Sequence, residues 1–148
     1  LSVLEIGCGV GWLGEYLQYM GIKDYIGIDS DPNILKKIPA QLEDKIKIIN
    51  VTKYIETLKG KPVFDRVVMI DVLEHFNPTE GVQLLQNLKL SLKNGGGVLV
   101  RVPNSGSPWG LNYQFGDLTH KAAYTSTSLS DGSSINAPFS YLPYLPVE

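Results

Sequence analysis

The chain has 148 residues, of which 43% are hydrophobic and 19% charged, and its formal net charge is −2. This length and balance fit one globular domain with its own core and exclude a disordered or fibrous chain. The weak negative charge offers no basic footprint for nucleic acid, and no apolar run reaches the roughly 18 residues that a membrane span needs. The single cysteine, Cys8, excludes an internal disulfide and fits a reducing compartment. We therefore expect a cytoplasmic protein without a membrane span and without a nucleic-acid partner, since a nucleic-acid substrate would need a local basic patch.

Apolar runs and turn signals alternate along the chain in the order strand, helix, strand, helix. This alternation predicts an α/β fold, a Rossmann-like parallel sheet with helices on both faces. The five strands that we expect are Val3–Ile6, Tyr25–Ile28, Ile46–Ile49, Arg66–Ile70 and Val98–Val102.

A glycine turn follows the first strand. In VLEIGCGVG, Gly7, Gly9 and Gly11 alternate directly after the apolar run, and Glu5 lies just inside its end. The turn leads into a helix predicted over Trp12–Met20, so bare backbone lies at the carboxyl edge of the sheet, where nucleotide-like ligands bind. The cysteine inside the turn is interpreted as a small filler rather than as a nucleophile.

The second strand ends in YIGIDSDP, which brings Asp29 to the same edge. An acid here can accept both hydroxyls of an adenosine ribose, because the second strand lies beside the first. Asp31 and Pro32 then begin a helix, with Asp31 as its cap. Since Asp31 already supplies the cap, we interpret Asp29 as a ribose-binding residue.

A further helix is predicted to begin at Asn77, because Asn77 and Glu80 have the spacing of a capping box. Leucines and a valine follow at helical spacing as far as Leu92, and the glycines Gly95–Gly97 end the helix. We interpret this helix as scaffold.

Three classes of nucleotide ligand compete for the glycine turn. A P-loop is disfavoured, because Glu15 stands after Gly14 where a lysine is needed. A dinucleotide fingerprint, GxGxxG, is matched by GVGWLG, which starts at Gly9. The turn itself, however, begins at Gly7, and counted from Gly7 the third glycine of the fingerprint is replaced by Trp12. The indole of Trp12 would prevent close packing of the helix. Glu5 would also repel a pyrophosphate, whereas it suits the ammonium and sulfonium of S-adenosylmethionine. The charges therefore favour the methyl donor, and an NAD-dependent oxidoreductase is the alternative.

Four stretches in this order, VLEIGCGVG, YIGIDSDP, FDRVVMIDVLEHF and LKNGGGVLVRVPN, resemble the motifs of class I S-adenosylmethionine-dependent methyltransferases. The resemblance covers residues 1–129. It implies an enzyme that moves a methyl group from S-adenosylmethionine to a small-molecule or sugar hydroxyl by direct in-line displacement.

The same resemblance implies a set of cofactor contacts. The glycines line the methionine part, Glu5 supports the turn or the ammonium, Asp29 holds the ribose and Ser30 lies beside the adenine. The family often has an aspartate after the third strand; here Asn50 could present its amide oxygen to the adenine amino group instead. The implied cofactor-binding residues are Glu5, Gly7, Cys8, Gly9, Gly11, Asp29, Ser30, Asn50 and Asp71.

Candidates for the catalytic role are the only two histidines of the chain and one acid. His75 follows the fourth strand, where a neutral imidazole could take a proton from an attacking hydroxyl, or could simply pack the cofactor pocket. The stretch SPWGLNYQFGDLTHKAAYTSTSL has neither strand nor helix period. It partly resembles a substrate-side segment of methyltransferases from sugar and surface-polysaccharide pathways.

In that segment Asp117 and His120, on either side of Thr119, could orient a sugar hydroxyl and accept its proton. The alternative is a loop tied down by its own side-chain hydrogen bonds. We expect no metal, because methyl transfer requires none and no Cys/His cluster offers a site.

Residues 130–148 have neither helical nor strand period, so we expect an irregular tail after a methyltransferase domain at residues 1–129. Leu1 stands directly before the first strand. Compared with the seven-stranded fold of the family, both features predict a chain truncated at both ends, with its fifth strand as an exposed edge. A truncated adenosyl-binding domain without turnover is therefore a further alternative.

Overall fold

The computed structural model describes residues 1–58, 60–131 and 139–141. Six strands form one parallel sheet in the order β3-β2-β1-β4-β5-β6. They are β1 (Ser2–Ile6), β2 (Asp24–Asp29), β3 (Ile46–Ile48), β4 (Phe64–Ile70), β5 (Leu92–Arg101) and β6 (Phe139–Tyr141). The predicted α/β parallel sheet and its five strands are confirmed.

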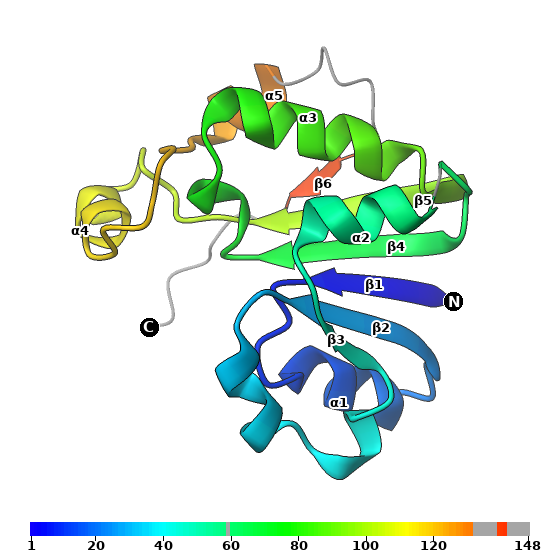
Figure 1. Cartoon of the computed structure of the whole chain (residues 1–148). Coiled ribbons are helices and arrows are strands. Elements are labelled where there is room, and N and C mark those ends of the chain that lie inside the picture. The colour runs from blue at the N-terminus through cyan, green and yellow to red at the C-terminus, as the bar shows by residue number, and fades with distance from the viewer. Residues whose placement is uncertain (59, 132–138, 142–148) are drawn as a thin grey trace.

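The order of the strands creates the crevice in which a ligand can bind. The chain starts at β1, moves outward to β2 and β3, and then returns to the other side of β1 with β4. Ligands of open α/β sheets bind at such a reversal, outside the carboxyl ends of the strands. These ends gather at the left edge of the sheet in Figure 1.

Helices complete the fold. The α-helices are α1 (Trp12–Tyr19), α2 (Val51–Leu58), α3 (Pro78–Lys89), α4 (Gly110–Phe115) and α5 (Ser126–Asp131), and the 3-10 helices are η1 (Pro32–Lys37), η2 (Ala40–Leu42) and η3 (Leu73–His75). The capping box is confirmed: the Asn77 side chain accepts the Glu80 N–H at 2.9 Å, and the Glu80 carboxylate accepts the Asn77 N–H at 3.1 Å. Asp31 caps its helix through the N–H of Asn33, but the helix is of the 3-10 type.

The sheet separates two apolar layers, which explains the alternation of residues along β1. Leu4 and Ile6 belong to a cluster that contains buried residues of α2 and α3. Val3 belongs to the cluster on the opposite face, against which α1 packs through Leu13 and Leu17. Helices therefore cover both faces, as the sequence predicts.

Several expectations for the second half of the chain are wrong. The helix α3 ends at Lys89 rather than at the glycines Gly95–Gly97, and β5 already begins at Leu92. The register of β5 against β4 shifts between the pairs Phe64–Leu92 and Arg66–Gly97. Two short helices, α4 and α5, lie where no period is visible. The expected exposed edge of the fifth strand pairs in parallel with β6, from Val98 with Phe139 to Val100 with Tyr141. The rest of the predicted tail, 132–138 and 142–148, lies outside the described residues.

Within the described ranges, no helix is both long and apolar enough to cross a membrane.

Candidate cofactor and acceptor site

The glycine turn is fixed against the end of β2. The N–H groups of Gly7 and Cys8 both donate to the carbonyl of Ile28, at 2.8 and 3.1 Å. Gly7 has a φ of +69°, and a Cβ there would overlap the side chain of Val72. The turn therefore needs glycine at this position, both for its backbone conformation and for its close approach to the segment after β4.

Asp29 points back to the glycine turn. Its Oδ2 accepts the N–H of Gly9 at 2.9 Å, and its Oδ1 accepts the N–H of Asp31 at 2.9 Å. An ionised carboxylate has about four acceptor positions, so two remain for a ligand. The geometry that the sequence predicts for Asp29 is thus present.

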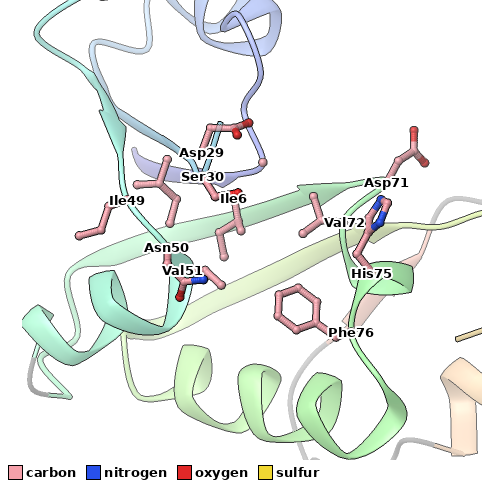
Figure 2. A pocket seen from close by; sticks show the side chains of 12 residues that line it. Ile6, Asp29, Ser30, Ile49, Asn50, Val51, Asp71, Val72, His75 and Phe76 are labelled. Carbon is pink, nitrogen blue, oxygen red and sulfur yellow. The ribbon is translucent and has the colours of Figure 1, made fainter. Parts of the chain in front are cut away.

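A cavity of about 340 Å³ opens at this edge of the sheet. Figure 2 shows Asp29 and Ser30 on one side of it, Asp71, Val72 and His75 on the other, and Asn50 and Val51 at the start of α2. Gly7, Asp29, Ser30, Asn50 and Asp71 are predicted cofactor residues that line it. The lining residues that sequence reasoning missed are Ile6, Ile28, Ile49, Val51, Val72 and Phe76. They are ordinary strand-end and core residues, and only the fold shows that one side of each faces the cavity.

Glu5, Cys8, Gly9 and Gly11 are predicted cofactor residues that do not line the cavity. Glu5 is 5% exposed and accepts a hydrogen bond from the hydroxyl of Tyr25 on the α1 face of the sheet. Burial raises the pKa of Glu5 to about 7, and the same cause raises the pKa of Cys8 to about 12. The position of Glu5 favours support of the turn over direct contact with a ligand, and the buried, protonated thiol fits the role of a filler.

The argument from Trp12 is wrong. Its side chain is 79% exposed and does not separate α1 from the sheet. The close approach is made by Gly14, where a Cβ would lie 2.5 Å from Cε1 of Tyr25. The close packing of α1 on β2 is therefore the one that a dinucleotide fingerprint requires. The choice between a dinucleotide and S-adenosylmethionine depends on the charges around the cavity.

Asn50 and Asp71 have structural tasks as well as places on the cavity wall. Oδ1 of Asn50 accepts the N–H of Thr52 at 2.9 Å, so the oxygen assigned to the adenine amino group also caps α2. This Asn before a helix is the signal that could have revealed α2. Asp71 has a φ of +54°, and its carboxylate pairs with the guanidinium of Arg101 at the end of β5.

The three predicted catalytic residues lie together beside the cavity, and His75 is the one that lines it. Nδ1 of His75 is 2.9 Å from Oγ1 of Thr119, whose hydroxyl donates to Oδ1 of Asp117 at 2.6 Å. The rings of His75 and His120 meet edge to face, 4.8 Å between centroids. Hydrogen bonds from Thr119 lower the pKa of Asp117, which keeps this acid ionised. Glu74 is buried behind the two rings, and its burial raises its pKa.

The segment that carries Asp117 and His120 is tied to η3 by backbone bonds. The N–H groups of Lys121 and Ala122 both donate to the carbonyl of Glu74, at 2.8 and 3.1 Å. Thr125 and Ser128 exchange side-chain bonds with each other's N–H, at 2.8 and 3.1 Å, which begins α5. The loop is therefore held by hydrogen bonds within itself and to η3, and its Thr119 contacts His75, which lines the cavity.

Comparisons with known proteins agree with this geometry. A family model described as a methyltransferase domain matches residues 1–134. The chain is 31% identical over 117 residues to a mitochondrial ubiquinone biosynthesis O-methyltransferase of Dictyostelium discoideum, which covers 70% of this chain and 36% of that protein. The chain thus spans little more than a third of the length of that curated relative.

Solved structures share the fold. A crystal structure of a SAM-dependent methyltransferase from Archaeoglobus fulgidus superposes with a TM-score of 0.77 and 26% identity, covering 90% of this chain and 58% of that one. The plantazolicin methyltransferase BpumL, solved with a pentazolic desmethylPZN analogue and SAH, has a TM-score of 0.70 at 20% identity and covers 92% of this chain and 55% of that one. The chain therefore belongs to the methyltransferase-domain family, with the fold of the class I S-adenosylmethionine-dependent methyltransferases.

Proposed function

We propose that this chain binds S-adenosylmethionine in the cavity at the β1–β4 reversal and transfers its methyl group to a hydroxyl of a small-molecule or sugar acceptor. The observation that carries the proposal is the bond from the Gly9 N–H to the Asp29 carboxylate beside the cavity. The family membership and the SAH bound to BpumL support the same cofactor.

The charges of the cavity support S-adenosylmethionine over a nicotinamide dinucleotide. Two carboxylates line it, those of Asp29 and Asp71, and the lining set described contains neither lysine nor arginine. Arg101 already pairs with Asp71, so the charge that a ligand would meet is mainly that of Asp29. This carboxylate would repel a pyrophosphate, whereas it attracts the ammonium and sulfonium of the methyl donor. The apolar walls formed by Ile28, Ile49 and Phe76 suit the adenine and the thioether.

Each predicted cofactor residue that lines the cavity then has a role. Asp29 accepts the ribose hydroxyls through its two remaining acceptor positions, and Gly7 leaves room for the methionine part beside the backbone. Ser30 and Asn50 lie beside the adenine. Asp71 is on the opposite wall, where the reactive methyl would lie.

The chemistry needs alignment more than functional groups. The acceptor oxygen attacks the methyl carbon, the carbon–sulfur bond breaks, and its electron pair stays on sulfur, leaving S-adenosylhomocysteine. In-line placement supplies much of the acceleration, and removal of the hydroxyl proton about 10²–10⁴-fold more. The polar group formed by His75, Asp117 and His120 is our candidate for that second task, because His75 lines the cavity.

An oxygen acceptor is supported by the relative named as an O-methyltransferase of ubiquinone biosynthesis. The partial resemblance of residues 107–129 to sugar-pathway enzymes supports a sugar hydroxyl. We also propose a cytoplasmic location, supported by the single cysteine.

The test is calorimetric titration of the chain with S-adenosylmethionine, S-adenosylhomocysteine and NADH. We expect the two adenosyl ligands to bind and Asp29→Ala to weaken them by about 10–100-fold, because a hydrogen bond to a charged group contributes about 1.5–3 kcal/mol. Asp29→Asn, which keeps an acceptor for Gly9, separates the loss of charge from the loss of the turn. Asp44→Ala is the matched control, because Asp44 is exposed and does not line the cavity.

Binding of NADH alone would contradict the proposal and favour the oxidoreductase. Adenosyl binding without methyl transfer to any hydroxyl acceptor would favour the binding domain without turnover.

A further inference from the structure

Glu74 is a buried acid without a hydrogen-bond partner for its carboxylate. Its side chain is 0% exposed, and among the described residues neither Oε1 nor Oε2 has a hydrogen-bond partner. Buried carboxylates in folded proteins are paired, hydrogen-bonded or bound to a metal, because an uncompensated one is costly. The surroundings of Glu74 therefore indicate what completes it.

Two imidazoles face this carboxylate. Nε2 of His120 lies 4.0 Å from Oε1 of Glu74, and the rings of His120 and His75 are 4.8 Å apart. One ligand atom from each of the three residues lies within 4.8 Å of the other two. A carboxylate and two imidazoles thus converge on one point beside the cavity.

The other nitrogen of each ring is already engaged. Nδ1 of His120 is 3.0 Å from the backbone carbonyl of Gln114, which can only accept, so Nδ1 carries the proton and Nε2 the lone pair. Thr119 donates its hydroxyl proton to Asp117 and therefore accepts from Nδ1 of His75, which leaves Nε2 of His75 with its lone pair. Histidines that bind metals are oriented by a carbonyl, a carboxylate or water on the second nitrogen. His120 meets this condition directly, and His75 does so through the Thr119 hydroxyl, which passes its own bond on to the Asp117 carboxylate.

We propose that Glu74, His75 and His120 bind a divalent transition-metal ion of the zinc type. Two histidines and one glutamate are a known donor set for Zn²⁺ with one open coordination position, and the same set binds other first-row ions. Ligand atoms of a tetrahedral zinc site lie about 3.3 Å apart, so separations of up to 4.8 Å must shorten by up to about 1.5 Å around the ion. Such a site differs from the expectation of no metal, because its ligands come from η3 and from the segment after α4 and make no local motif.

The ion would act on the acceptor, and this part rests on the proposed function. His75 lines the cavity, so an acceptor hydroxyl there can fill the open coordination position. A bound ion would lower the pKa of a coordinated hydroxyl, whose proton would pass to water. The oxygen would then attack the methyl carbon as the carbon–sulfur bond breaks and its electron pair stays on sulfur. With its lone pair bound to the ion, His75 would not accept the hydroxyl proton itself. The metal ion would then activate the acceptor in place of the imidazole.

The experiment is a titration of the untagged, metal-stripped chain with Co²⁺, followed by visible absorption, and with Zn²⁺, followed by calorimetry. We expect one ion per chain, with a cobalt spectrum of nitrogen and oxygen coordination. Glu74→Gln and His120→Asn should each weaken binding at least about 100-fold, since both remove a direct ligand, whereas loss of an outer partner costs 10–100-fold. Glu56→Gln is the matched control, because Glu56 lies exposed on α2.

Binding of S-adenosylhomocysteine is measured on the same samples to report the folded state. A wild-type chain that binds S-adenosylhomocysteine but takes up neither ion overturns the metal site and leaves the proposed function standing. Equal affinity of Glu74→Gln and wild type for Co²⁺ also overturns it. Uptake of one ion by a chain that binds no adenosyl ligand supports the metal site and contradicts the proposed function.

Discussion

The two walls of the cavity are built in different ways. On the β1–β2 side, backbone N–H groups of the glycine turn reach the carbonyl of Ile28 and the carboxylate of Asp29 on the adjacent strand. On the other side, polar side chains meet from η3 and from residues 105–122. All buried side-chain polar atoms that lack a partner among the described residues belong to this second side, to Glu74, Ser105 and Gln114. The buried polar side chains described on the first wall thus have their hydrogen-bond partners within the protein. The second wall has buried polar atoms to which a ligand or an ion can bind.

The sharpest test of the first wall is a comparison of two glycines in one turn. Gly7→Ala places a Cβ against Val72 at a φ of +69°, whereas Gly9→Ala, at +51°, meets nothing within 4 Å. A left-handed backbone costs a non-glycine residue about 1–2 kcal/mol, and overpacking adds about 1–3 kcal/mol. We expect Gly7→Ala to lower the free energy of unfolding by about 2–5 kcal/mol and Gly9→Ala by about 1–2 kcal/mol, measured by urea denaturation. Equal losses would show that the turn does not approach Val72 closely.

The second prediction concerns the acid beneath this wall. Burial raises the pKa of Glu5 from 4.5 to about 7, so between these values the folded state binds more protons than the unfolded state. The contribution of Glu5 to stability is therefore fully present below about pH 4.5 and is lost as the pH rises to 7. We expect Glu5→Gln, which mimics the protonated acid, to gain up to about 3 kcal/mol in unfolding free energy relative to wild type between pH 4.5 and pH 8.

Urea denaturation at both pH values measures this difference, and Glu15→Gln on α1 is the control for loss of one carboxylate. A difference between Glu5→Gln and wild type that does not change with pH would mean that Glu5 is ionised in the fold without cost.

The second wall is tested by separating binding from turnover. Thr119→Val removes the hydroxyl that joins His75 to Asp117. If this wall contacts the acceptor and not the cofactor, the affinity of the variant for S-adenosylhomocysteine stays within about twofold of wild type. The rate of methyl transfer falls at least about tenfold, because a positioned proton acceptor contributes about 10²–10⁴-fold to such a rate. Thr79→Val, exposed at the start of α3, is the control. A loss of cofactor affinity that parallels the loss of rate would show that the two walls act as one.

The same difference explains how much of the molecule the sequence predicts. The strands, the capping box of α3 and the position of Asp29 follow from local patterns, since each depends on residues a few positions apart. The sequence also indicates both histidines as candidates, but not that His120 meets Glu74, because His120 lies far along the chain from the adjacent Glu74 and His75. The bonds from Lys121 and Ala122 to the Glu74 carbonyl bring the two segments together. The pairing of β6 with β5 was missed because its three residues have too little length to show a period.

Asp71 follows β4 on the second wall, and it allows the smallest and most specific test. Its carboxylate pairs with Arg101, but both side chains are about half exposed, at 48% and 49%, so the pair contributes less than about 1 kcal/mol. Its backbone is left-handed, with a φ of +54°, which asparagine adopts readily and alanine does not. We expect Asp71→Asn to change the free energy of unfolding by about 0.5 kcal/mol or less and Asp71→Ala to lower it by about 1 kcal/mol more, again by urea denaturation. If the two variants lose the same free energy of unfolding, the ion pair with Arg101 rather than the left-handed backbone makes aspartate favourable at this position. Asp71 would then stabilise the second wall through its side chain, as the other polar residues of that wall do.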